Sequence, residues 1–167
     1  MEIALNGNQI LDLLDHKANL VQYRDVENYK SIEQLLGPYK KCVLLYHTSE
    51  DFGHWCCLYQ VGETIYFFDS YGVMIDDQLK FLPKNLREDM NSSHRYLTNL
   101  LYRSKKNIEY NQYELQKHSP LIQTCGRHVV NRLRYPEISI DDYYKMFKDA
   151  SKYMPIDEII VDLVPLN

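Results

Sequence analysis

Apolar and polar positions follow two different periods along this chain, and these periods separate a central group of strands from flanking helices. The run KCVLLYHT (41–48) predicts a buried strand because it is short, almost wholly apolar and bounded by polar residues. The next stretches, HWCCLYQ (54–60) and IYFFDS (65–70), are rich in aromatic residues and are joined by VGET, which predicts a β-hairpin. A further strand is expected over IEYNQYELQ (108–116).

Helical periodicity surrounds this strand group. Helices are predicted over NGNQILDLLDH (6–16), SIEQLLG (31–37), DDQLKFLPKNLRED (76–89), SSHRYLTNLLYRS (92–104), TCGRHVVNRLRY (124–135), SIDDYYKMFKDASKYM (139–154) and PIDEIIVDLV (155–164). The expected boundary residues are Ser31, Thr124 and Ser139 as N-caps, Gly37 as a helix end and Pro155 as a first helical residue. This order predicts the α+β class, with a short central mixed or antiparallel sheet flanked by helices. No repeat or flexible linker interrupts it, so we expect a single domain over residues 1–167.

Composition narrows the classes of function. The net charge of -4 disfavours a general nucleic-acid binder, which is normally basic. The N-terminal stretch MEIALNGNQILDLL carries an acid where a signal peptide carries positive charge, and no apolar run reaches the length of a membrane span. Without a secretion signal, the cysteines Cys42, Cys56, Cys57 and Cys125 are expected to be free thiols in a reducing, intracellular compartment.

A histidine and an aspartate face each other across the predicted hairpin. With the turn centred on Val61 and Gly62, position 54 pairs with position 69, and a register shifted by two leaves them diagonal neighbours. In either register His54 and Asp69 can meet at the open end of the hairpin. A carboxylate there would fix the imidazole tautomer, as a general base requires. The alternative is a surface ion pair without a catalytic role.

A cysteine begins the helix that follows Thr124. Cys125 would lie in the first turn, where the helix dipole and the free backbone amides favour a thiolate and can stabilise an oxyanion. Gly126 leaves room there for a substrate carbonyl or for close packing of another helix. The alternative is a buried structural cysteine, which is common at such positions.

In combination these stretches resemble a known enzyme family. The sequence GHW, a strand that ends in FFDSYG, the segment DDQLK, a glutamine and a helix that begins with TCG are similar to the adenovirus maturation protease and its relatives, which include the SUMO-deconjugating proteases. The resemblance covers roughly residues 40–135. Within this superfamily, the sequences of these motifs most resemble those of viral capsid-maturation proteases, including the proteases of virophages.

The resemblance implies a thiol protease with His54 as base, Asp69 as the third member of the triad and Cys125 as nucleophile on a helix packed against the sheet. Trp55 and Gly126 would wall the substrate site. The family's oxyanion glutamine lies six or seven residues before the cysteine, where this chain has His118 and Ser119. Gln116 is therefore our first candidate for the oxyanion donor, followed by His118 and then Gln123.

The same resemblance implies cleavage of polypeptides near glycine, in capsid or other viral precursor proteins, in the host cytoplasm, the viral factory or the virion. Deconjugation of a ubiquitin-like modifier is the alternative activity. No cofactor, no metal and no membrane are expected, and the chain is expected to be a monomer.

Other classes of function remain open from the residues alone. His54, Cys56, Cys125 and His128 could supply four ligands to zinc, although neither His-x-Cys nor Cys-x-x-His is a common zinc spacing. A binding module that has this fold and no activity is a further alternative. Adenovirus-type enzymes are assisted by DNA, but we expect the basic stretches YRSKKN (102–107) and RHVVNRLR (127–134) to be solvated helix faces. Tyr143, Tyr144 and Phe147 are expected to pack in the core.

Overall fold

The fold is built on one five-stranded sheet with the strand order β1-β2-β3-β4-β5. The computed structural model describes residues 4–49 and 52–166, so the acidic residue Glu2 lies outside the described part. The strands are β1 (Asn19–Gln22), β2 (Lys41–His47), β3 (Gly53–Val61), β4 (Thr64–Phe68) and β5 (Asn107–Tyr110). The inner pairs β2–β3 and β3–β4 are antiparallel, whereas the outer strands β1 and β5 run parallel to their neighbours. The predicted α+β class with a mixed sheet is confirmed.

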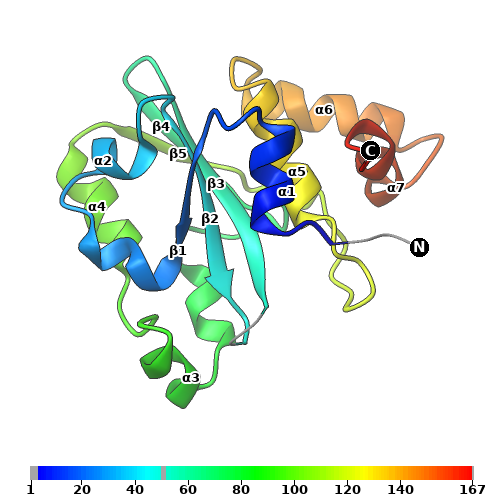
Figure 1. The fold of residues 1–167 in the computed structure, drawn as a ribbon. Coiled ribbons are helices and arrows are strands. Elements are labelled where there is room, and N and C mark those ends of the chain that lie inside the picture. The colour runs from blue at the N-terminus through cyan, green and yellow to red at the C-terminus, as the bar shows by residue number, and fades with distance from the viewer. Residues whose placement is uncertain (1–3, 50–51, 167) are drawn as a thin grey trace.

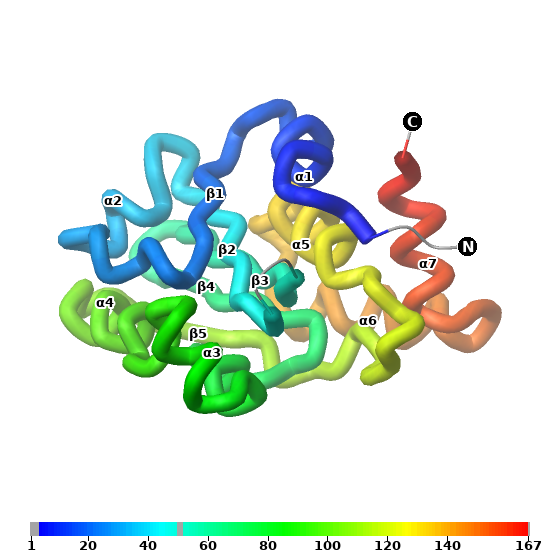
Figure 2. The backbone as a smooth tube through the Cα atoms, turned by 60° about the horizontal axis from the view of Figure 1, so that its bottom comes forward, coloured from blue at the N-terminus to red at the C-terminus, as the bar shows by residue number. Residues whose placement is uncertain are grey.

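Helices cover both faces of this sheet (Figure 1). One face carries α1 (Gly7–Leu13), α5 (Cys125–Arg134), α6 (Ile140–Ala150) and α7 (Ile156–Leu163). The opposite face carries the 3-10 helix η1 (Tyr23–Asn28), α2 (Ile32–Leu36) and α4 (Tyr96–Ser104), and the segment with η2 (Asp77–Phe81) and α3 (Lys84–Asp89) lies at one end of the molecule. Figure 2 shows α5 directly below α1 and α7 to the right of both helices.

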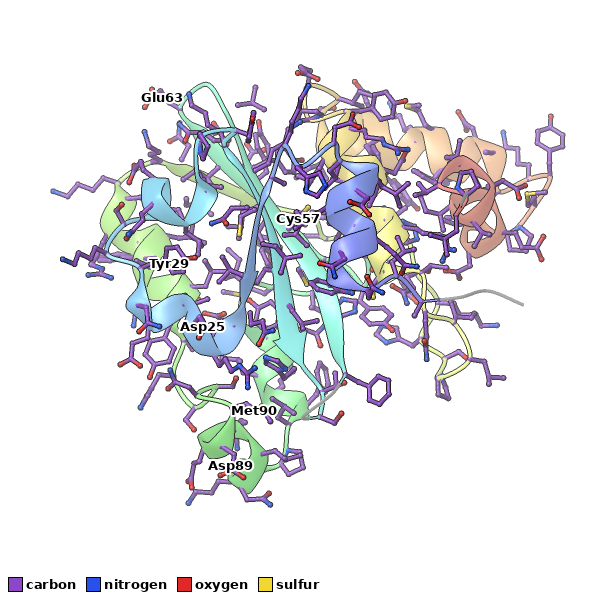
Figure 3. The ribbon with its side chains drawn as sticks, viewed as in Figure 1. Asp25, Tyr29, Cys57, Glu63, Asp89 and Met90 are labelled. Atoms are coloured by element: carbon purple, nitrogen blue, oxygen red, sulfur yellow. The ribbon has the colours of Figure 1, made fainter. Side chains whose placement is uncertain are left out.

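The alternation of side chains along β3 divides its residues between two cores. Cys56 and Leu58 pack toward η1, α2 and α4, together with Leu44, Tyr46 and Phe67. Trp55, Cys57 and Tyr59 pack toward α1 and α5, together with Val129, Val130 and Phe147. Figure 3 places Cys57 in the layer between the sheet and α1. A strand that is buried on both faces accounts for the unbroken apolar run of this stretch.

The hairpin forms as predicted, but its turn lies one residue later than expected. Val61 pairs with Thr64, so the turn is Gly62-Glu63 and not Val61-Gly62. Gly62 has a φ of +60°, a conformation that suits glycine at the first position of a two-residue hairpin turn. Glu63 marks the tip in Figure 3. The register is therefore the one shifted by two, in which positions 54 and 69 are not directly opposite.

Several predicted elements differ from the structure. The helix expected over 76–89 is broken by Pro83 into η2 and α3. The strand expected over 108–116 ends at Tyr110, after which the chain is irregular as far as Thr124. Strand β1 was not predicted, because NLVQ has only one fully buried residue, Val21, and shows no clear alternation. Within the described residues, no helix has the length and apolar character needed to cross a membrane.

The predicted helix caps are correct in two cases. Ser31 accepts a hydrogen bond from the backbone N–H of Gln34, and Ser139 accepts one from the N–H of Asp142. Gly37 ends α2 with a φ of +70°, as predicted. Pro155 occupies the N-cap of α7 and not its first helical position. Thr124 occupies the N-cap position of α5, but its side chain makes no capping hydrogen bond.

Candidate active site

The candidate site lies where strand β3 extends beyond its partner β4. Residues 57–61 of β3 pair with β4, whereas residues 53–56 pair only with β2. The chain leaves β4 after Phe68 and turns away through Asp69, and Gly72 donates its N–H to the carbonyl of Asp69. Gly72 has a φ of +74°, and a Cβ there would lie 2.8 Å from the backbone of Tyr113, so this turn requires glycine. In this part of β3, Gly53 and His54 line the same cavity as Cys125, the first residue of α5.

At this edge the structure brings His54 and Asp69 together. Nε2 of His54 lies 2.7 Å from Oδ1 of Asp69, and both residues are buried. The carboxylate accepts two further hydrogen bonds, from the N–H of Tyr71 to Oδ1 at 2.8 Å and from Nε2 of Gln78 to Oδ2 at 2.9 Å. Because Asp69 is fully inaccessible, these three donors replace the water that would otherwise solvate its charge.

The environment of this pair favours both charged forms. Burial by itself raises the pKa of Asp69, but the adjacent His54 and the donated hydrogen bonds outweigh burial and hold that pKa below its usual range. Burial by itself lowers the pKa of His54, but Asp69 and, to a smaller extent, the Cys125 thiol outweigh burial and hold that pKa well above its usual range. An ionised Asp69 carboxylate can only accept hydrogen bonds, so Nε2 of His54 donates to it. Nδ1 of His54 is then the nitrogen that can exchange a proton with the Cys125 thiol.

Cys125 is the first residue of α5, and it lines the same cavity as His54, whose pKa its thiol helps to raise. The described cysteines are all free thiols, as predicted. Cys125 retains 9 % exposure, whereas Cys42, Cys56 and Cys57 are inaccessible. The expected cap by Thr124 is wrong, because its hydroxyl donates to Oδ1 of Asp157 at 2.7 Å. The start of the Cys125 helix is thus not covered by the Thr124 side chain.

A cavity of about 920 Å³ opens onto the imidazole and the thiol. Its lining residues include Leu5, Gly7, Leu20, Phe52, Trp55, Tyr71, Gln78, Pro120 and Ile122. Trp55 forms one wall, and its indole N–H donates to the carbonyl of Leu5 at 3.0 Å. The segment before α1 therefore contributes to the cavity, a role that no pattern in the sequence predicted.

Gly126 serves close packing and does not line the cavity. A Cβ at this position would lie 3.0 Å from Cβ of Leu5, 3.3 Å from Cδ1 of Ile10 and 3.4 Å from Cδ1 of Trp55. Of the two expectations for Gly126, close helix packing is therefore the one that the structure shows, because α1 rests directly on it. Its effect on the cavity wall is indirect, through the position of Trp55.

Among the three candidates for an oxyanion donor, Gln116 is buried and is bound to Ser70. Gln116 was expected to end a strand, but it lies in the irregular segment after β5. The carbonyl of Ser70 accepts the backbone N–H of Gln116 at 3.0 Å, and the hydroxyl of Ser70 donates to its Oε1 at 2.7 Å. This contact orients Nε2 toward the cavity side, where it donates to the carbonyl of Ile122 at 3.2 Å. The exposed Gln123 also lines the cavity, whereas His118 does not line it.

Three residues that the sequence did not single out organise this site: Ser70, Tyr71 and Gln78. The ring of Tyr71 stacks on His54 with a centroid distance of 4.6 Å, and His118 stacks on the opposite face of Tyr71 at 4.0 Å. Both Ser70 and Tyr71 belong to FFDSYG, and Gln78 belongs to DDQLK, so the quoted motifs contained these residues without indicating their contacts.

The four-ligand zinc set is not assembled. His54 and Cys56 lie near Asp69, with potential ligand atoms within 4.8 Å of one another. His128, in contrast, is buried beside Phe147, and both of its ring nitrogens lack a hydrogen-bond partner within the described residues. Burial lowers the pKa of His128 to about 3, so this ring is neutral and does not oppose a charge on His54.

The basic helix α5 is not a solvated face, contrary to expectation. All of its residues from Cys125 to Leu133 are buried. The guanidinium of Arg132 stacks on the ring of Tyr143 at 4.2 Å, and Arg127 donates from Nε to the carbonyl of Val164 at 3.1 Å. Most of its positive charge therefore serves packing inside the protein, while the stretch 102–107 contains the exposed residues Tyr102, Arg103, Lys105 and Asn107. Tyr143 and Phe147 lie in the core, as predicted, and Tyr144 packs against it.

Comparison with known proteins identifies a relative from a virophage. No model of a known protein family matches the chain. The ASFV pS273R protease is a solved structure with a TM-score of 0.44 and 15 % identity, and the match covers 83 % of this chain and 60 % of that protease, so this chain spans about three fifths of its length. The uncharacterized protein V9 of Sputnik virophage is 38 % identical over 162 residues, which cover 95 % of this chain and 93 % of V9. The chain therefore belongs to the same family as virophage protein V9.

Proposed function

We propose that this protein is a cysteine endopeptidase with His54, Asp69 and Cys125 as its catalytic residues. The observation that carries the proposal is the buried pair in which Asp69 binds Nε2 of His54 at 2.7 Å, on the wall of a cavity that Cys125 also lines. Because His54 and Cys125 both line this cavity, a substrate can reach them. A structural ion pair does not need a third, nucleophilic member at the start of a helix.

In the proposed reaction, Nδ1 of His54 takes the proton of the Cys125 thiol, and the thiolate attacks the scissile carbonyl. The developing oxyanion is stabilised by the backbone N–H of Cys125 and by Nε2 of Gln116. The imidazolium of His54 then protonates the leaving amine, and a water molecule hydrolyses the acyl-enzyme with His54 as base. Asp69 stabilises the imidazolium throughout, which agrees with the raised pKa of His54.

The proposed substrates are polypeptides with glycine at the cleavage site, in capsid or other precursor proteins of a virus. The family shared with a virophage protein and the resemblance to viral maturation proteases support this choice. Trp55 narrows the cavity beside His54, so small residues pass where larger ones collide with the indole.

The test compares the wild-type chain with two variants, Cys125→Ala and the matched control Cys42→Ala. Each is incubated with a peptide library and with tagged SUMO and ubiquitin, and the cleavage sites are sequenced. We expect cleavage of short peptides after glycine by the wild type and by Cys42→Ala, and none by Cys125→Ala. Iodoacetamide should label Cys125 first, because the other three thiols are inaccessible.

Each other outcome selects a different function. Cleavage that requires a folded modifier would assign a deconjugating protease. Retained cleavage by Cys125→Ala would refute the catalytic assignment. An unreactive Cys125 in a chain that binds peptides without cleaving them would assign a binding module.

A further inference from the structure

The nucleophile and the candidate oxyanion donor lie at the two ends of one irregular loop. Gln116 precedes this loop and Cys125 follows it, and between them Ser119, Pro120, Ile122 and Gln123 line the cavity. Catalysis of acyl transfer requires the donor and the nucleophile to keep a fixed separation, because a displacement of about 1 Å can lower the rate about 10²-fold. A loop without helix or strand geometry needs another constraint at its ends.

A single carboxylate on α7 supplies contacts to both ends of this loop. Oδ2 of Asp157 accepts the backbone N–H of Lys117 at 3.1 Å, directly after Gln116. Oδ1 of Asp157 accepts the hydroxyl of Thr124 at 2.7 Å, directly before Cys125. Both bonds have a charged acceptor, which makes them stronger than bonds between neutral groups.

The helix that carries Asp157 is itself anchored to the core. Ile160 of α7 and Val164 at its end are inaccessible and belong to the same core as Val129 and Val130 of α5. The carbonyl of Val164 also accepts the hydrogen bond from Arg127. Helix α7 is therefore tied to the Cys125 helix through its second half and its C-terminal end, and this anchors the helix from which Asp157 holds the loop.

We infer that Asp157 is a positioning residue, which sets the separation of Gln116 and Cys125 by binding the residues next to them, Lys117 and Thr124. This inference rests on the proposed function. It also gives the C-terminal helix a role in the chemistry, although α7 itself does not line the cavity.

The test measures kcat and KM for the peptide that the library selects, and separately the rate of Cys125 alkylation by iodoacetamide. Alkylation needs the thiolate and no oxyanion donor, so it reports on His54 and Cys125 alone. We expect Asp157→Ala to lower kcat about 10- to 100-fold. KM, the alkylation rate and the melting temperature should change little. Asp157→Asn should lower kcat less than Asp157→Ala does. Its amide oxygen can still accept the hydrogen bond from the Thr124 hydroxyl, whereas its NH₂ group cannot accept the one from the Lys117 N–H.

Matched variants separate positioning from a loss of charge or of fold. Glu158→Gln removes an exposed acid next to Asp157 on the same helix and should leave kcat unchanged. Thr124→Val should lower kcat, Thr124→Ser should restore it, and Thr124→Val combined with Asp157→Ala should be no worse than Asp157→Ala alone.

An unchanged kcat in Asp157→Ala would overturn the inference, as would equal losses in kcat and in alkylation rate. A wild-type chain that cleaves no peptide would overturn the proposed function, and the inference with it.

Discussion

Ser70 determines the orientation of the Gln116 amide. Its hydroxyl donates to Oε1 of Gln116 at 2.7 Å, and its backbone carbonyl accepts the N–H of the same residue at 3.0 Å. Since Oε1 is occupied, the amide cannot rotate by 180° without losing this bond, and Nε2 remains the end that faces Ile122 and the cavity. Ser70 follows Asp69 directly, so one turn of chain places both the partner of the base and the support of the oxyanion donor.

The first prediction tests this support. Ser70→Ala removes the bond that orients the amide, and we expect kcat to fall by up to about tenfold, the effect of one hydrogen bond between neutral groups. Gln116→Ala removes the donor itself and should lower kcat about 10²- to 10³-fold. Ser92→Ala is the matched control, because Ser92 is equally buried but its hydroxyl donates to the nearby carbonyl of Met90, away from the site. A loss in Ser70→Ala as large as in Gln116→Ala would mean that Ser70 contacts the substrate.

The second prediction concerns Asp69 and the alkaline side of the pH profile. Asp69 is the main group that raises the pKa of His54, so Asp69→Asn should lower that pKa. The reaction needs protonated His54 for the leaving amine, and the alkaline limb of kcat/KM should therefore move to lower pH. The variant should also lose activity, because the asparagine amide favours the wrong tautomer of His54. We expect this loss to be smaller than that in His54→Ala, since a cysteine–histidine pair depends less on its third member than a serine triad does.

Two results would contradict this view of Asp69. An alkaline limb that stays in place would show that another group sets the pKa of His54. Equal losses in Asp69→Asn and His54→Ala would show that Asp69 does more than orient and stabilise the imidazole.

The third prediction concerns acid stability and His128. The folded protein keeps His128 neutral down to a pKa of about 3, whereas an unfolded chain protonates it near its ordinary value of about 6.5. Between these values the unfolded state binds the extra proton, so this residue lowers the free energy of unfolding by about 1.4 kcal/mol for each unit that the pH falls.

His128→Leu should remove this dependence and leave no broken hydrogen bond, because neither ring nitrogen has a partner within the described part of the chain. Urea denaturation should show a gain in stability over wild type that grows from pH 7 to pH 4. His16→Asn, which also removes a histidine but at an exposed position with a φ of +57°, is the control for the substitution itself. A gain that is independent of pH would mean that His128 affects packing alone.

The parts of the fold that were predicted correctly depend on local patterns, and the parts that were missed depend on distant contacts. The alternation of residues in β3 and β4 predicted the hairpin and the meeting of His54 with Asp69. The turn was misplaced by one residue because the strand pattern does not show which turn position receives Gly62. The position of Gln116 depends on Ser70, and the hydroxyl of Thr124 binds Asp157 instead of capping its helix. The periodicity of apolar and polar residues predicts neither of these two contacts.

The last prediction concerns Trp55 and the choice of substrate. The indole is held by the carbonyl of Leu5 and lies close to two glycines, since a Cβ at Gly7 or at Gly126 would come within 3.4 Å of its ring. The wall of the cavity is thus rigid, and a rigid wall discriminates by size. Trp55→Phe shortens this wall, so cleavage after residues larger than glycine should rise about tenfold relative to cleavage after glycine.

The measurement is the ratio of kcat/KM for two peptides that differ only in glycine or alanine at the cleavage site. Phe52→Leu is the control, because Phe52 also lines the cavity but is exposed, and an exposed residue at the rim excludes little. Melting curves must show that Trp55→Phe remains folded, since the indole also fills the core between α1 and α5. An unchanged ratio in a folded Trp55→Phe protein would mean that the backbone around Cys125, and not the indole, selects for glycine.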